Sequence, residues 1–307
     1  MFHWMSLVRD LTKLKISVFA TLSACAGFIL ARGGISWEMA TPGMGILLLA
    51  CGSCALNQYQ EREIDRRMLR TRGRPLPAGK MPPAQALLTS GVLIGSGFLV
   101  LFLLGRGWVW LLGLFAVFWY NGVYLYLKRR TAWAILPGAL IGAIPPAIGW
   151  VSGEGGLTDP RLGAICFFFF IWQVPHFWVL LLIFSEDYER AGLPNLARRL
   201  TAGKLERITF FWILSTAASC ILIPFLFPLN FAFVFPILLF LTFWFVWQAG
   251  FLEGTRVAKE DLKKIFVRLN VYAFLVFALL SMDRIVAQNH PPWGLIGKFI
   301  SRVFPWV

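Results

Sequence analysis

The stretch that decides the fold reads Pro42-Gly-Met-Gly-Ile-Leu-Leu-Leu-Ala-Cys-Gly-Ser-Cys-Ala-Leu-Asn57-Gln-Tyr-Gln-Glu61-Arg-Glu-Ile-Asp65. It begins as an apolar run that is long enough to enter a bilayer as a helix, and it ends in polar residues. Asn57, Glu61 and Asp65 recur at four-residue spacing, so their side chains lie on one helical face. We call these three residues the acidic ladder. Two carboxylates and an amide at a membrane boundary predict a site for Mg2+ and a diphosphate.

Arginines recur at the same four-residue spacing, at Arg62, Arg66, Arg70 and Arg74. Guanidinium groups bind phosphate oxygens in bidentate fashion, so these arginines predict a diphosphate clamp. The alternative is a cytoplasmic loop whose arginines only orient the chain in the membrane and pair with nearby acids. That alternative is weaker for the acidic ladder, because polar groups at the end of an apolar helix usually face a bundle interior or a cavity.

The composition is that of a membrane protein: 58% of the 307 residues are hydrophobic and only 14% are charged. Apolar stretches long enough to cross a bilayer as helices recur along the whole chain. They lie near 15–32, 42–60, 83–105, 107–127, 133–152, 162–185, 206–228, 231–251 and 265–283. We therefore expect an all-α, polytopic bundle of about nine transmembrane helices forming a single domain over residues 1–307. The first six, at about 15–185, carry the motifs, and the last three, at about 206–283, complete the scaffold.

The basic residues test these helix positions, because lysines and arginines of short loops gather on the cytoplasmic side. Of the 29 lysines and arginines, 23 fall before the first span or in alternate loops, which places them on one face. The amino terminus is then cytoplasmic and the carboxyl terminus outside. The net charge of +14 is mostly a topology signal. It favours anionic lipid and anionic substrates as partners, whereas nucleic acid is not expected.

Several further segments accompany the ladder between residues 11 and 200. They are Leu11-Thr-Lys-Leu-Lys-Ile16, Arg70-Thr71 with Arg74-Pro75, Tyr124-Leu-Tyr-Leu-Lys128, Gly142-Ala-Ile-Pro145-Pro146-Ala-Ile-Gly149, Trp172-Gln-Val-Pro175-His176 and Asp187-Tyr-Glu-Arg-Ala-Gly192. Each is weakly specific alone. Together they resemble the UbiA-type intramembrane prenyltransferases, and within them the branch that farnesylates protoheme.

The resemblance implies an enzyme of a bacterial plasma (inner) membrane that moves a farnesyl group from farnesyl diphosphate to the vinyl group of protoheme IX, giving heme O. It implies Mg2+ as the cofactor, held by the ladder, with Asp187 assisting from the opposite side. It assigns diphosphate binding to Lys128 with Tyr124, and less strongly to Lys15, Arg70 and Arg74. Lys128 is also readily explained as a charge that ends a transmembrane helix. Downstream heme-processing or oxidase-assembly proteins are possible partners.

His176 is the only histidine expected within the membrane. An intramembrane ionisable side chain is a functional candidate, and imidazole coordinates heme iron or bonds a propionate. The alternative is a buried histidine that is bonded to a neighbouring helix. Pro145-Pro146 predicts a break in the fifth transmembrane helix, either shaped to a substrate or purely structural.

Three departures from the family pattern weaken the assignment of the acceptor. Glu61 stands in place of an aspartate, Leu14-Lys15 in place of Pro-Arg, and Phe184 and Glu186 where basic residues are common. One alternative function is therefore prenyl transfer to an aromatic quinone precursor or another lipid-soluble acceptor. A second, from another class, is a transporter or cofactor-insertion protein without chemistry of its own.

Overall fold

The computed structural model of the chain describes residues 2–105, 107–195, 200–227, 229–250 and 258–289, and in these ranges every regular element is helical. The amino-terminal half contains α1 (Phe2–Leu11), α2 (Leu14–Arg32), η1 (Trp37–Met39), α3 (Ala40–Arg67), α4 (Pro83–Leu103), α5 (Val109–Phe118), η2 (Trp119–Tyr124) and α6 (Leu125–Arg130). The remainder contains η3 (Ala132–Ala134), α7 (Ile135–Ser152), α8 (Pro160–Ile183), α9 (Ser185–Arg190), α10 (Ala202–Leu226), α11 (Val234–Ala249) and α12 (Lys259–Asn289).

The expected membrane bundle is confirmed. In the part of the chain that the structure describes, eight helical segments are long and apolar enough to cross a membrane, and the shorter α11 is the ninth apolar helix. Each coincides with one of the nine predicted spans. The helix that carries the ladder is longer than its predicted span, because α3 continues for 28 residues to Arg67. Because the helix extends past the apolar run, the whole acidic ladder is part of one continuous helix.

Local sequence signals explain several helix ends. The carboxylate of Asp159 accepts the Arg161 backbone N–H at 2.9 Å and Pro160 follows as the first residue of α8, which is a favourable N-terminus. Gly33 ends α2 in the left-handed conformation, with φ of 87°. These ends separate neighbouring spans with short connections, so consecutive helices run back and forth through the bundle.

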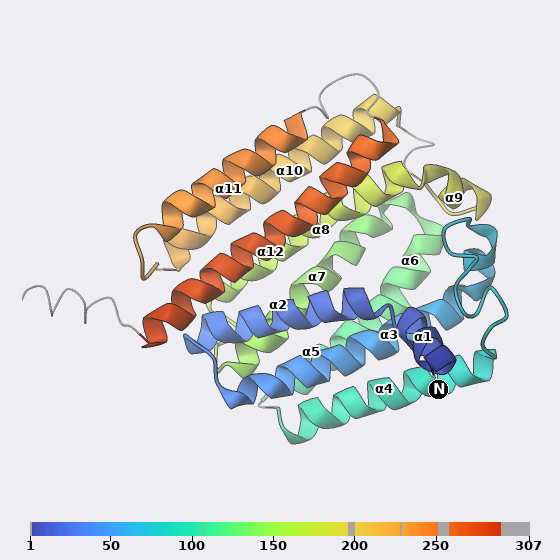
Figure 1. Cartoon of the computed structure of the whole chain (residues 1–307), viewed down its shortest axis with the longest axis horizontal. Coiled ribbons are helices and arrows are strands. Elements are labelled where there is room, and N and C mark those ends of the chain that lie inside the picture. The colour runs from blue at the N-terminus through green and yellow to red at the C-terminus, as the bar shows by residue number, and fades with distance from the viewer. Residues whose placement is uncertain (1, 106, 196–199, 228, 251–257, 290–307) are drawn as a thin grey trace, which may run out of the picture.

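The long helices lie side by side, from α10, α11 and α12 at one edge to α4 at the other (Figure 1). One end of the bundle carries α9, the end of α3 and the connection from α3 to α4 (Figure 1). The loops predicted to be cytoplasmic lie at this end, as far as they are described. The carboxyl-terminal tail beyond residue 289, predicted to be outside, lies beyond the described residues.

Helices α2 and α7 touch through their backbones. A Cβ added at Gly149 or at Gly27 would overlap a backbone carbonyl of the partner helix, that of Ala24 or Pro146. Small residues allow such close packing in membrane bundles. The predicted break at Pro145-Pro146 was wrong, because α7 runs through both prolines from Ile135 to Ser152. Contact with α2 covers this part of the helix.

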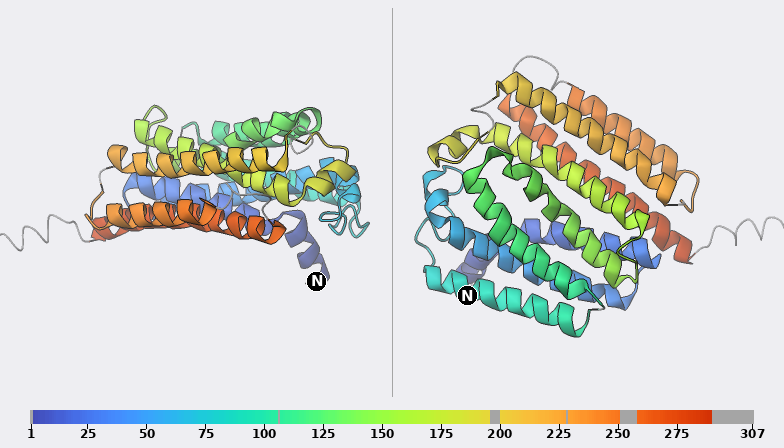
Figure 2. Two further views of the ribbon diagram at one scale, coloured as in Figure 1. Left: turned by 90° about the horizontal axis from the view of Figure 1, so that it is seen from above. Right: turned by 180° about the vertical axis from the view of Figure 1, so that it is seen from behind.

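The last three long helices pack against one another, and α10 and α12 lie beside α8 (Figure 2). Their polar contacts join them to one another: Thr242 on α11 bonds Tyr272 on α12 at 3.0 Å, and Asp283 on α12 accepts the backbone N–H groups of Asn230 and Phe231 at 3.1 Å. These contacts fix the scaffold, whereas the motif segments all lie before α10, between residues 11 and 192.

Candidate active site

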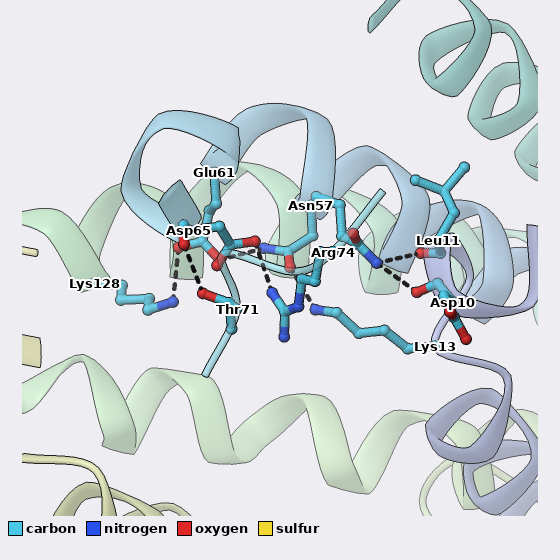
Figure 3. A network of polar contacts seen from close by, with 10 residues as sticks. Asp10, Leu11, Lys13, Asn57, Glu61, Asp65, Thr71, Arg74 and Lys128 are labelled. Carbon is cyan, nitrogen blue, oxygen red and sulfur yellow. Dashed lines mark hydrogen bonds and ion pairs between the residues drawn. The ribbon is translucent and has the colours of Figure 1, made fainter. Parts of the chain in front are cut away.

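The acidic ladder is buried on the inner face of α3. Asn57, Glu61 and Asp65 are only 3%, 4% and 3% exposed. The Asn57 amide donates to the Glu61 carboxylate at 3.0 Å, so successive turns of the helix are in direct contact (Figure 3). A buried carboxylate is stable only when it is paired, so each acid requires a partner from elsewhere in the fold.

Three cations from different parts of the chain contact the ladder, two of them at its carboxylates (Figure 3). Lys128 on α6 lies 2.7 Å from Oε1 of Glu61, and Arg74 in the connection after α3 lies 2.7 Å from Oδ2 of Asp65. Lys13 donates to Oδ1 of Asn57 at 2.8 Å. The ladder is therefore a compact cluster of hard oxygen atoms with ammonium and guanidinium groups around it.

Lys13 reaches the ladder because the chain turns sharply between α1 and α2. Its backbone is left-handed, with φ of 47°, which is rare for a residue with a side chain. Gln58, next to Asn57, donates to the carbonyls of Asp10 and Leu11 at 2.7 and 2.8 Å and so holds the turn. Burial lowers the pKa of the Lys13 ammonium to about 8.

The structure does not bring Lys15 to the ladder. It is exposed on the first turn of α2, and Lys13 occupies the position that sequence reasoning assigned to it. Helical spacing does not predict this exchange, because the left-handed residue interrupts the helical period between α1 and α2. The sequence did contain one indication that Lys13 could reach the ladder, because Lys13 also lies directly before the first predicted span.

Tyr124 and Lys128 are placed by an irregular helix. Residues Trp119–Tyr124 form a π-helical turn, a feature that is frequent at functional sites. Within it Asn121 donates to the Ser53 carbonyl on α3 at 3.0 Å, which fixes this segment against the ladder helix. The turn therefore sets the direction in which the following helix α6 presents Lys128 to Glu61.

An aromatic wall continues from Lys128 into the bundle. The Tyr124 ring stacks on Phe177 of α8, with ring centres 6.2 Å apart. Gly138 on α7 makes room for it, since a Cβ there would lie 2.7 Å from the tyrosine ring. Tyr124, Lys128, Phe177 and Tyr188 line a small pocket at this end of the bundle.

His176 lies next to Phe177 on α8 and packs in an aromatic box. Its ring centre is 5.1 Å from that of Trp172 and 4.8 Å from that of Phe266 on α12. Asn270 on α12 forms a side-chain hydrogen bond with it, whereas its Nδ1 atom is buried and has no partner among the described residues. The bond to a neighbouring helix fits the structural alternative, and the unpartnered nitrogen leaves one position for a ligand.

Asp187 is buried at the same end of the bundle, but its carboxylate binds backbone. Its two oxygens accept the N–H groups of Leu69 at 2.9 Å and Arg70 at 3.1 Å. Asp187 therefore holds the connection after α3. Its expected assistance to the metal from the opposite side stays a prediction.

The donor set of the ladder fits Mg2+. Two carboxylates and an amide oxygen are hard ligands, and Mg2+ usually takes one or two carboxylates with substrate phosphates and water. In the described ranges no group of three or more His, Cys, Asp and Glu side chains is arranged to hold a metal alone. The two carboxylates and the amide oxygen of the ladder thus offer part of a coordination shell for Mg2+.

Comparisons with known proteins agree with this site. Residues 19–282 match the UbiA prenyltransferase family. A protoheme IX farnesyltransferase from Geobacter sulfurreducens is 40% identical over 213 residues, covering 68% of this chain and 77% of the relative. One from Opitutus terrae is 35% identical over 284 residues, covering 90% of this chain and 94% of the relative.

Solved structures show the same fold. A digeranylgeranylglyceryl phosphate synthase superposes with a TM-score of 0.72 at 14% identity, over 92% of this chain and 98% of the other. A UbiA homolog from Archaeoglobus fulgidus, bound to GPP and Mg2+, superposes with a TM-score of 0.62 at 14% identity, over 90% of this chain and 99% of the other. The sequence match and the shared architecture lead to one conclusion: this chain belongs to the UbiA prenyltransferase family.

Proposed function

We propose that this protein is an integral membrane enzyme that transfers the farnesyl group of farnesyl diphosphate to the vinyl group of protoheme IX, producing heme O. The observation that carries the proposal is the buried acidic ladder with its three cations at one end of a membrane bundle. The acceptor is supported by the relatives, which are protoheme IX farnesyltransferases from several bacteria. Their sources favour the bacterial inner membrane as its location.

The proposed donor site combines the ladder with the surrounding cations. Asn57, Glu61 and Asp65 would hold Mg2+, and the UbiA homolog with bound GPP and Mg2+ supports this assignment. The bound metal supplies positive charge that stabilises the departing diphosphate. Lys13 and Lys128, which contact ladder oxygens in this structure, would bind the oxygens of the diphosphate when Mg2+ is held by the ladder.

The aromatic wall serves the second half of the reaction. Loss of diphosphate from the allylic carbon creates a cation that water would capture, so this carbon must stay dry until it bonds to the vinyl carbon. The positive charge left on the vinyl group then takes one water, which supplies the hydroxyl of heme O. The rings of Tyr124 and Phe177 lie directly beyond Lys128 and exclude water. Their π faces also stabilise positive charge. The carbon–oxygen bond therefore breaks at the edge of an apolar, aromatic surface.

Replacing Lys13 by Met is expected to raise the KM for farnesyl diphosphate by about tenfold or more, because a charge-assisted bond to the diphosphate is lost. Lys15→Met is the matched control, since Lys15 is exposed on the same helix start, and its KM should stay within about twofold. Steady-state kinetics of the purified variants measure both. If both substitutions raised the KM equally, Lys13 would not be the lysine that binds the diphosphate specifically.

Replacing His176 by Ala is expected to lower heme O formation while leaving binding of prenyl diphosphate nearly intact. The imidazole can coordinate the iron of a heme acceptor, whereas an aromatic quinone precursor offers no metal for it to bind. The product is quantified by mass spectrometry after extraction, and donor binding is measured separately on the same preparation. If the yield does not change, the histidine has no part in acceptor binding.

The function itself is tested with purified protein, labelled farnesyl diphosphate, Mg2+ and protoheme. Heme O should form only when all four are present. Expression in a bacterium that lacks its own enzyme, followed by mass analysis of the extracted heme, tests the same activity in the cell. Prenylation of an aromatic precursor in place of heme would establish the alternative acceptor, and the absence of any magnesium-dependent product would exclude a prenyltransferase.

A further inference from the structure

The arginines that follow the ladder at equal spacing have different partners. Arg62 and Arg66 lie 3.8 and 3.0 Å from the exposed Glu63, so they form surface ion pairs. Arg74 is bound to Asp65 of the ladder. These three guanidinium groups therefore already have a carboxylate partner.

Arg70 differs from the other three. Its guanidinium carbon lies 4.6 Å from the centre of the Phe184 ring, in a cation–π contact, and no carboxylate of the described residues pairs with this guanidinium. A ring covers only one face of the planar group. The N–H donors point outward from its edge and stay available for a bidentate anion.

The backbone of Arg70 is fixed by the same segment that holds its side chain. Asp187, three residues after Phe184, accepts the N–H groups of Leu69 and Arg70. Met68 is buried with Ala191 and Leu193 just beyond. Both ends of Arg70 are thus held by residues 184–193, which reduces the conformational entropy that anion binding would cost.

This segment also borders the pocket of the candidate site. Tyr188, next to Asp187, lines the pocket together with Lys128 and Tyr124. Phe184 is the residue that joins α8 to α9 at this end. The Arg70 guanidinium is therefore held at the end of the bundle that carries this pocket.

We propose that Phe184 is a positioning residue for the donor: its ring holds the Arg70 guanidinium, free of carboxylate partners, where it binds the diphosphate of the incoming substrate. The inference rests on the donor half of the proposed function and does not depend on the acceptor. Phe184 acts only by positioning Arg70 and does not contact the reacting atoms.

The test measures binding of inorganic pyrophosphate with Mg2+ to the full-length protein in lipid nanodiscs by calorimetry. Phe184→Leu should weaken binding by about three- to tenfold, the range of one cation–π contact, whereas Phe184→Tyr, which keeps a ring, should bind like the wild type. Tyr126→Leu is the matched control. It removes the exposed ring that lies 5.3 Å from the guanidinium of Arg130, and it should leave binding unchanged.

Two further readouts separate positioning from a general structural effect. In the Arg70→Met background, Phe184→Leu should weaken binding no further. In turnover assays Phe184→Leu should raise the KM for farnesyl diphosphate while kcat and the KM for protoheme stay constant. Wild-type affinity in Phe184→Leu, failure of Phe184→Tyr to restore binding, or additive loss in the double variant overturns the inference.

The outcomes also distinguish this inference from the proposed function. Wild-type protein that binds Mg2+ and pyrophosphate but does not farnesylate heme refutes the acceptor alone, and the binding series still decides the role of Phe184. Active wild-type enzyme with an unaffected Phe184→Leu variant refutes the inference alone. Wild-type protein that binds no pyrophosphate refutes both the inference and the donor half of the function.

Discussion

Replacing Glu61 by Gln and Asp65 by Asn together is expected to abolish farnesyl transfer, with turnover falling by about a thousandfold or more. Both amides keep the size of the side chain and remove its charge. Without the two carboxylates the ladder has no anionic ligand for Mg2+, and the diphosphate loses the cation that stabilises it as it leaves. Product formation is measured by mass spectrometry with saturating farnesyl diphosphate, protoheme and Mg2+.

Glu63→Gln is the control for this double variant. Glu63 lies on the same helix between the two acids, but it is exposed and pairs with Arg62 and Arg66 at the surface. It should retain wild-type turnover. Thermal unfolding in detergent checks that the double variant is folded, since it leaves Lys128 and Arg74 without their acidic partners. Undiminished turnover in a double variant that has no carboxylate at 61 or 65 would falsify the proposed donor site.

Replacing Lys128 by Met is expected to reduce both stability and activity. The Lys128–Glu61 pair joins α6 to α3, and the two side chains are only 18% and 5% exposed. Removing one partner of a buried ion pair leaves an uncompensated charge, at a cost of about 3 kcal/mol. The diphosphate also loses an ammonium ligand. We expect a lower unfolding temperature and a higher KM for farnesyl diphosphate.

A second substitution separates these two effects. Adding Glu61→Gln to Lys128→Met removes the unpaired charge, so the unfolding temperature should recover while activity stays lost. Arg130→Met, two residues away on α6, should change neither property, because its guanidinium lies over the exposed ring of Tyr126. If Lys128 only ended a transmembrane helix, Lys128→Met and Arg130→Met would behave alike.

The positions of the helices could be predicted from the sequence because they depend on local properties. A bilayer selects apolar runs of a fixed length, and the loop charges orient them. The ladder was also predictable, since four-residue spacing places Asn57, Glu61 and Asp65 on one face whatever surrounds the helix. That prediction already assumed that the helix continues past the apolar run to Asp65, and α3 does continue, as far as Arg67.

Other features depend on packing between distant segments. Lys13 contacts the ladder in place of Lys15 because its own backbone is left-handed. Gln58 on α3 holds this turn through the preceding backbone carbonyls. The π-helical turn at Trp119–Tyr124 changes the helical period by which Lys128 would be placed. Arg70 and Arg74 differ because Arg70 lies over the ring of Phe184 and Arg74 pairs with Asp65. Their equal spacing along the chain does not predict these partners.

By itself, the sequence determined that this chain is a helical membrane protein with an acidic face at the end of its second transmembrane helix, and it predicted a metal site there. Hydrophobic length and helical period are properties of short segments, so they are visible without the fold. Only the tertiary structure decided which cation meets which residue of the ladder, because the partners are 44 residues apart for Lys13 and Asn57 and 67 apart for Lys128 and Glu61. A buried charge is stable only beside its counter-charge, and the packing of the helices selects that partner.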